Sequence, residues 1–212
     1  GGDDTIYGQE GNDILVGGNW HFDGASGDDA YASILSEAAM ANATINPSVE
    51  QILDYLVNNG HRFGQGDVTD GNNILNGGTG DDLIIGGGGD DTIIGGTGND
   101  TLFGGGGKNL FAWNTADRDG GQDVILDFKM GDDLLYFQDL FGEAGDLTDL
   151  LQTNQVNISA GDMNTLLLSM ADQTVEIHLQ DSLTAQQFID INSNNITEQA
   201  ALLEVLLTSN LI

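Results

Sequence analysis

The 212-residue sequence contains no cysteine, one proline and only four lysine and arginine residues together. Without cysteine the chain forms no disulfide bond, so any cross-link that stabilises it must come from another source such as metal ions. The 34 aspartate and glutamate residues give a net charge of -30, which disfavours nucleic acid and anionic membrane surfaces as partners. No apolar run reaches the roughly 18 residues of a membrane-spanning helix, and no such span is expected.

Hydrophobic residues make up 39% of the chain, and 32 residues are glycine. The glycines gather in nine-residue units over residues 77–112, which read GGTGDDLII, GGGGDDTII, GGTGNDTLF and GGGGKNLFA. A fixed period of this kind is typical of a solenoid. The alternative, a flexible glycine-rich linker, does not explain the large apolar residue at every ninth position.

Each unit combines a glycine-rich loop with a short strand. Glycine at positions one, two and four suits a tight loop with positive φ and close backbone approach. The alternation of side chains along the strand predicts that position eight points to the interior. Position eight holds Ile84, Ile93, Leu102 and Phe111.

Position six of these units is acidic or an amide, and identical acidic loops that stack would repel one another. Calcium relieves this repulsion, because it accepts six to eight hard oxygen ligands in a tolerant geometry. If two units form one coil, loops 18 residues apart are stacked. We therefore expect several calcium ions between the loops of Asp82 and Asp100, and between those of Asp91 and Asn109.

A rougher block of the same repeat occupies residues 1–32, with Asp4, Asp13 and Asp29 at position six. Its last unit begins early, at Gly24. The sequence begins inside a repeat and without methionine, so we interpret it as part of a longer chain, and no signal peptide is visible.

Glycine becomes rare over residues 33–67, where the apolar spacing changes to about 3.6 residues and predicts two helices. Asn46 before Pro47 is a good N-cap, and Gly60 ends the second helix. We expect a helical insertion that packs on the roll, because position nine places Ile85 and Phe103 on one outer face. The repeat resumes over residues 68–112, with Asn73 at position six.

Residues 113–212 lack the strict repeat and are expected to cap the solenoid. Strands are predicted at 124–128, 134–137, 165–170 and 174–179, the last two as a hairpin, and helices around 147–151, 185–189 and 198–207. Residues 117–123 resemble the opening of an EF-hand, but they lack its later acidic positions, and we predict a surface turn.

These features together resemble the C-terminal end of giant RTX adhesins that bacteria export by type I secretion. The resemblance is carried by both repeat blocks, by FAW at 111–113 with DVILDF at 123–128, by GDDLL at 131–135 and by VEIHL at 175–179. It implies a mainly β fold, namely a calcium-bound parallel β-roll with a two-helix insertion and a C-terminal α+β capping region. It also implies an uncleaved export signal within residues 113–212.

The same resemblance implies a ligand set for several Ca²⁺ ions, formed by position-six side chains and by glycine carbonyls of the loops. The implied ligands are Asp4, Asp13, Asp29, Asn73, Gly78, Gly80, Asp82, Gly87, Gly89, Asp91, Gly96, Gly98, Asp100, Gly105, Gly107 and Asn109. The neutral amides Asn73 and Asn109 are expected to attract calcium less.

The partners implied are calcium and the type I machinery, which comprises an ABC transporter, a membrane fusion protein and an outer-membrane channel. A monomer is expected, either secreted or on the bacterial cell surface. Adhesins of this type attach cells to surfaces, biofilm matrix or ice.

Two other functions have to be weighed. RTX repeats also follow catalytic domains of secreted enzymes, but this sequence has neither H-E-x-x-H nor G-x-S-x-G, and its three histidines, His21, His61 and His178, are scattered. We expect no enzyme activity. A ligand-binding module is the other reading, with Trp20, His21 and Phe22 as a candidate contact, although a packed bulge explains that trio more simply.

Overall fold

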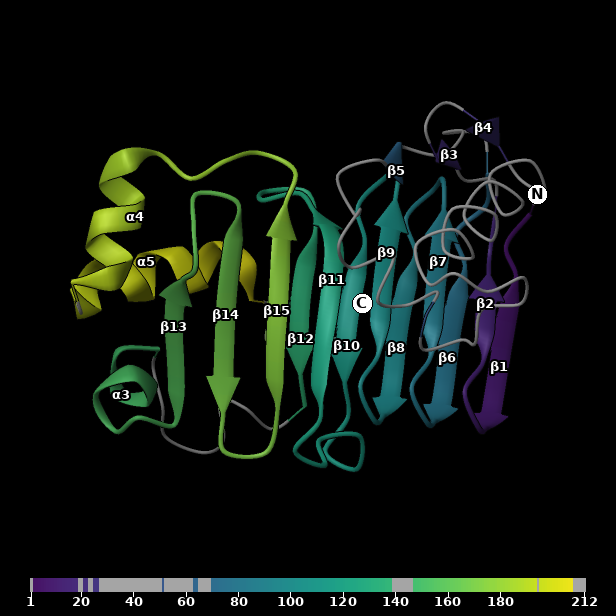
Figure 1. The fold of residues 1–212 in the computed structure, drawn as a ribbon, viewed down its shortest axis with the longest axis horizontal. Helices are drawn as coiled ribbons and strands as arrows, with labels where there is room; N and C mark the ends of the chain where they lie inside the picture. Colours follow the sequence, from purple (N-terminus) through teal and green to yellow (C-terminus); the bar gives the residue numbers. More distant parts are fainter. Residues whose placement is uncertain are drawn as a thin grey trace.

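The structure is a computed structural model. It describes residues 2–18, 21–22, 25–26, 51, 63–64, 70–138, 147–193 and 195–207. The core of the fold is a pair of facing β-sheets, with helices at the end opposite to β1 (Figure 1). The five-stranded sheet has the order β1 (Thr5–Glu10), β6 (Ile74–Thr79), β8 (Thr92–Thr97), β10 (Leu110–Trp113) and β12 (Leu134–Phe137).

The seven-stranded sheet has the order β13 (Val156–Ala160), β14 (Thr165–Met170), β15 (Thr174–Leu179), β11 (Gln122–Phe128), β9 (Thr101–Gly105), β7 (Leu83–Gly87) and β2 (Ile14–Val16). Successive repeat units therefore alternate between the sheets, so two units make one coil. Leu75 pairs with Ile93 in one sheet, and Ile84 pairs with Leu102 in the other.

The position-eight side chains point inward, as predicted. Those of both sheets join one buried cluster that holds Leu15, Leu75, Ile84, Ile93, Leu102 and Phe111. Because strands of opposite sheets contribute to the same cluster, the two sheets face each other across it. The apolar position-nine residues Ile85 and Phe103 lie outside this cluster and are nevertheless buried.

The two repeat blocks form one continuous stack. Ile6 of β1 pairs with Leu75 of β6, and Leu15 of β2 pairs with Ile84 of β7, all in parallel. The residues between the blocks therefore do not interrupt either ladder.

The segment between the blocks differs from the prediction where it is described. His21–Phe22 (β3) pairs antiparallel with Ala25–Ser26 (β4) and with Phe63–Gly64 (β5) in a separate three-stranded sheet. The unit expected from Gly24 therefore does not continue the stack at residues 25–26, because these residues pair with β3. Gln51 is helical. Asp29, predicted in the first repeat block, lies outside the described residues, and so does the predicted helical insertion at 33–67 apart from residues 51 and 63–64.

The seven-stranded sheet is mixed, which corrects the expectation of a single parallel roll, whereas the five-stranded sheet is parallel throughout. All pairs of repeat strands are parallel, but β13, β14 and β15 are joined antiparallel as a meander. The predicted hairpin is confirmed, because β14 and β15 pair antiparallel. Only three residues separate these strands, and so short a connection favours antiparallel pairing. The second strand of the hairpin, β15, also pairs with β11, in parallel, and so links the meander to the repeat strands.

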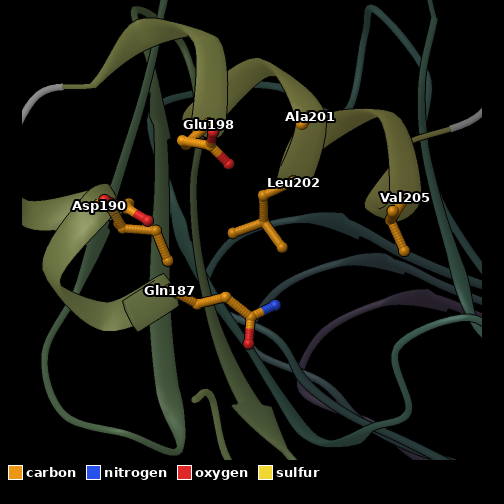
Figure 2. Close-up of a pocket in the computed structure, with 7 residues that line it drawn as sticks. Gln187, Asp190, Glu198, Ala201, Leu202 and Val205 are labelled. Carbon is orange, nitrogen blue, oxygen red and sulfur yellow. The ribbon is translucent and has the colours of Figure 1, made fainter. Parts of the chain in front are cut away.

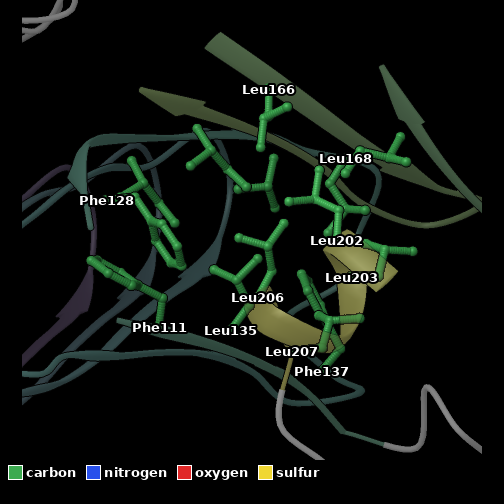
Figure 3. Packing of buried hydrophobic residues seen from close by; sticks show 14 of the residues in the cluster. Phe111, Phe128, Leu135, Phe137, Leu166, Leu168, Leu202, Leu203, Leu206 and Leu207 are labelled. Atoms are coloured by element: carbon green, nitrogen blue, oxygen red, sulfur yellow. The ribbon is translucent and has the colours of Figure 1, made fainter. Parts of the chain in front are cut away.

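The helices of the C-terminal region are α3 (Leu147–Gln152), α4 (Ala185–Asn192) and α5 (Ile196–Leu206). Thr184 begins α4 with a capping box, because its hydroxyl accepts the N–H of Gln187 while the Gln187 side chain reaches the Thr184 N–H. Leu203 and Leu206 of α5 are fully buried and lie in the cluster with Leu135 and Phe137 (Figure 3). This helix therefore covers the interior where the five-stranded sheet ends at β12.

Candidate metal centre

The position-six residues form two columns along the stack. The first column contains Asp13, Asp82, Asp100 and Asp123, and the second contains Asp4, Asn73, Asp91, Asn109 and Asp133. Within a column the backbone N–H of each residue donates to the side-chain Oδ1 of the next, as from Asp82 to Asp100 at 2.9 Å and from Asp91 to Asn109 at 3.1 Å. The predicted stacking of loops 18 residues apart is confirmed.

Both columns continue beyond residue 112, where the strict repeat ends. The Asp100 N–H donates to Asp123 Oδ1 at 2.9 Å, and the Asn109 N–H donates to Asp133 Oδ1 at 2.8 Å. These residues are 23 and 24 positions downstream, so a search for the 18-residue spacing misses them. The run GDDLL around Asp133 keeps the order of positions four to eight and was the available signal.

Four carboxylate oxygens in the columns have no hydrogen-bond partner. They are the buried Oδ2 atoms of Asp13, Asp82, Asp91 and Asp100. An ionised carboxylate that is buried without a partner is costly, and native proteins neutralise it or pair it with a cation. These four oxygens are therefore where the structure lacks a positive charge.

Burial also makes ionisation costly for three of these groups. Burial raises the pKa of Asp82 to about 6 and that of Asp91 to about 7. Burial, with repulsion from the neighbouring Asp123 carboxylate, raises the pKa of Asp100 to about 8. At neutral pH ionisation of Asp91 and Asp100 is therefore unfavourable unless a cation is bound.

The first glycine of each unit keeps open the space next to these oxygens. A Cβ on Gly77 would collide with Asp82 Oδ2 and with the carbonyl oxygen of Gly95 in the next coil. A Cβ on Gly86 would meet Asp91 Oδ2 and the Gly104 carbonyl in the same way. A carboxylate oxygen and a carbonyl oxygen from two stacked loops thus face one small space, and such hard oxygens are the ligands of calcium. The residues present fit this ion.

The amides at position six close their loops differently. Asn73 Nδ2 donates to the Gly71 carbonyl at 3.2 Å and to the Gly86 carbonyl at 3.4 Å, and Asn109 Nδ2 donates to the Gly106 carbonyl at 3.4 Å. At these two positions an amide N–H donates to the carbonyl oxygens, whereas an aspartate would need a cation between its carboxylate and those oxygens. That Asn73 and Asn109 attract calcium less stays a prediction.

Side-chain donors also bond to Asp123, the last residue of the first column. Asp123 Oδ2 accepts hydrogen bonds from Trp113 Nε1 at 2.5 Å and from Gln173 Nε2 at 2.6 Å. Asp123 is 1% exposed, and these two donors satisfy the Oδ2 atom, which is unpaired in Asp13, Asp82 and Asp100. Sequence reasoning does not find this arrangement, because Gln173 lies 50 residues away in the hairpin.

The glycines at positions two and four have a structural role in the stack. All eight in the predicted ligand set have positive φ, between 84° and 120°, and a Cβ on Gly96 or Gly98 would collide with the carbonyl of Gly78 or Gly80 in the coil above. The carbonyls of Gly78, Gly80, Gly87 and Gly89 therefore point from one coil toward the next. Calcium ligation by these carbonyls and by those of Gly96, Gly98, Gly105 and Gly107 stays a prediction.

Other acidic residues serve the backbone. Asp119 Oδ1 accepts the Gly121 N–H at 2.9 Å, and Asp117 Oδ2 accepts the Asn114 N–H at 3.0 Å, so the EF-hand-like segment is a turn. Within the described ranges no three His, Cys, Asp or Glu side chains gather as a metal cluster. In the columns the unpaired carboxylate oxygens instead occur one per loop, beside carbonyls.

A separate hollow of about 160 Å³ lies between α4 and α5. Its lining mixes the carboxylates of Asp190 and Glu198 with the aliphatic side chains of Leu202 and Val205 (Figure 2). None of the predicted calcium ligands lies there.

Stacked glycine loops that each present an unpaired carboxylate oxygen beside a backbone carbonyl define a calcium-binding repeat solenoid. A family model described as the RTX calcium-binding nonapeptide repeat matches four copies, within residues 1–19, 67–102 and 85–112. These parts of the chain are RTX calcium-binding repeats. The match covers neither the unit predicted at Gly24 nor the C-terminal region. No curated protein matches the chain.

We expect Asp91→Ala to weaken the calcium response more than Asp4→Ala. Asp91 is 1% exposed, its Oδ1 accepts the Asn73 N–H at 2.7 Å and its Oδ2 has no partner, whereas Asp4 is exposed in the first loop. Loss of Asp91 should cost about 1 to 3 kcal/mol from the unpaired N–H alone. Calcium titrations followed by circular dichroism measure both midpoints, and equal midpoints would contradict this arrangement of ligands.

Without calcium, the stability of the stack should fall as the pH rises from about 4 to 8. The folded-state pKa values of Asp82, Asp91 and Asp100 lie at about 6, 7 and 8, above the unfolded value of about 3.9. Protons therefore bind the folded state more tightly, and this stabilisation is complete below the unfolded pKa and lost through the folded one. Urea unfolding of calcium-free protein at pH 5 and pH 8 tests this, and a higher midpoint at pH 8 would refute it.

Proposed function

We propose that this chain is a calcium-dependent folding module of a secreted protein. The observation that carries the proposal is the set of four buried, unpaired Oδ2 atoms in the stacked loops. RTX repeats are typical of secreted proteins, and they occupy both stacked blocks here. Outside the cell calcium is at millimolar concentration, which is the range in which extracellular calcium modules bind.

The residues of the loops would hold calcium, and the ion would supply the positive charge that the loops lack. Position-six carboxylates provide the charged ligands, and the glycines leave room for carbonyls of the next coil. At the low calcium concentration of the cytosol the carboxylates stay unpaired, and their cost opposes folding. Folding is thereby confined to the outside of the cell.

The finer proposal is that the chain ends a large adhesin exported by type I secretion. It rests on the resemblance of the two repeat blocks and of residues 111–113, 123–128, 131–135 and 175–179 to that class, and on the position of the α+β region beyond the repeats. The module itself is proposed to be non-catalytic, secreted or cell-surface, and monomeric, with the export machinery as its partner. None of the described helices is long and apolar enough to cross a membrane.

Export and folding can be tested with fusions of a reporter to residues 1–212 and to residues 1–112, in cells with a type I exporter. The full fusion should be secreted, and it should resist protease only in millimolar calcium. The fusion that lacks 113–212 should remain inside. It also loses Asp123 and Asp133, the last acceptors of both columns, so calcium binding by residues 77–112 should persist but weaken.

A fusion of residues 1–146 provides the control for this second effect, because it keeps Asp123 and Asp133 and removes the hairpin and helices. Secretion of either truncated fusion at the level of the full one would show that the export signal lies outside the deleted residues. Protease resistance that is independent of calcium would refute the folding proposal.

A further inference from the structure

The residues at position five form a second hydrogen-bonded ladder, which runs in the opposite direction to the columns of position six. In this ladder the backbone N–H of each position-five residue donates to the position-five side chain of the preceding coil. The donor and acceptor pairs are Asn72 to Asp3, Asp81 to Asn12, Asp90 to Asn72, Asn99 to Asp81, Lys108 to Asp90 and Gln122 to Asn99, all at 2.8–3.0 Å. Adjacent side chains at positions five and six therefore reach to opposite neighbours.

The residue types at position five follow the need for an acceptor. Wherever the next loop offers its N–H, position five is Asp or Asn. Lys108 is neither Asp nor Asn, but no N–H needs it as an acceptor. The Asp132 N–H of the next loop donates to the Lys129 carbonyl at 3.1 Å instead. Gln122 occupies position five of the last loop in the first column, where it only donates.

The position-five oxygen also explains glycine at position four. A Cβ on Gly80, Gly98 or Gly107 would come within 3.0 Å of Oδ1 of Asn12, Asp81 or Asp90, respectively. The side-chain oxygen thus lies directly over the fourth residue of the next coil and fixes the separation of the two loops. That separation determines how close the carbonyl of one loop lies to the position-six carboxylate of the other.

We propose that the position-five Asn and Asp residues are positioning residues of the calcium loops. They act as hydrogen-bond acceptors that hold consecutive loops at the spacing calcium needs, and they are not ligands themselves. Asn12, Asn72 and Asn99 accept at 2.8–3.0 Å like Asp3, Asp81 and Asp90, so the acceptor matters and the charge does not. This inference rests on the proposed function, because it assumes that the loops bind calcium.

The test compares Asp81→Ala, Asp81→Asn and Lys108→Ala in the full chain by isothermal calorimetry with calcium chloride. Asp81→Ala removes the acceptor of the Asn99 N–H at 2.8 Å and of Asn99 Nδ2 at 3.2 Å. It should raise the dissociation constant about 5- to 10-fold, the effect of losing the first of these bonds, because the Asn99 side chain is exposed and can bond to water. The number of bound ions should not change, because no ligand is lost. Asp81→Asn keeps the acceptor and should bind within about twofold of the parent, and so should Lys108→Ala.

An affinity of Asp81→Ala equal to that of the parent would overturn the proposal. So would equal weakening by Asp81→Asn, which would show that the carboxylate charge itself acts. If Asp81→Ala does not fold in saturating calcium, Asp3→Ala and Asp3→Asn carry the same comparison at the edge of the stack. Failure of the parent protein to bind calcium would instead refute the proposed function, so the two failures are distinguishable.

Discussion

Protein stripped of calcium at pH 8 should unfold about 5 to 20 °C below the same protein in millimolar calcium. A site with a dissociation constant of about 10⁻⁴ to 10⁻³ M contributes from a few tenths to about 1.5 kcal/mol at that concentration. If each of the four unpaired carboxylates marks one site, the sites together contribute about 2 to 6 kcal/mol, and 1 kcal/mol shifts the midpoint of a chain of this size by about 2 to 4 °C. Thermal unfolding followed by circular dichroism measures the difference.

Magnesium at equal concentration is the control for this experiment. Magnesium requires near-octahedral geometry and releases its water reluctantly, so it should restore little of the lost stability. A chelated sample with the same midpoint as the calcium-loaded sample would show that the loops do not need the ion. Full rescue by magnesium would show that they need only screening of their charge.

The effect of Asp100→Asn on stability should change sign between the calcium-free and the calcium-loaded protein. At pH 8 without calcium the variant should be more stable than the parent by about 1 to 3 kcal/mol. It removes a buried group whose pKa is raised to about 8, while its Oδ1 still accepts the Asp82 N–H. In calcium the variant should be less stable than the parent, because a charged ligand is lost.

Asn73 and Asn109 are natural precedents for this change, because their amides donate to carbonyls of their own loops. Urea unfolding of parent and variant with and without calcium gives the four free energies that are needed. The matched control is Asp119→Asn, whose carboxylate lies in the exposed turn at Gly121 and should not alter the response to calcium. A variant less stable than the parent in both conditions would show that Asp100 has only a structural role.

The repeat part of the fold could be predicted from the sequence, because its physical rules are local. Inward-facing residues at position eight follow from strand alternation, and the 18-residue stacking follows from two units per coil. The strand β12 and the hairpin β14–β15 were predicted with the observed bounds, since strong apolar alternation marks them. The strand β13 (Val156–Ala160) was not predicted, although its apolar residues also alternate.

Features that depend on contacts between distant residues could not be predicted. The mixed sheet arises where β15 joins β11, and nothing local specifies that pairing. Asp123 and Asp133 extend the columns through longer, glycine-poor loops, whose length breaks the period. The ladder at position five was missed because a residue that varies between Asp, Asn, Lys and Gln gives a weak pattern, and only the geometry shows what each one accepts.

The most direct measurement is the number of calcium ions that the chain binds, counted by equilibrium dialysis and atomic emission. The parent is compared with the triple variant Asp82→Asn, Asp91→Asn and Asp100→Asn, which keeps every Oδ1 acceptor and replaces three of the four unpaired carboxylates. The account predicts that the parent binds several ions, and that the triple variant loses most of them while it stays folded in chelator. Equal numbers of bound ions in the two proteins would contradict the central claim that these carboxylates hold calcium.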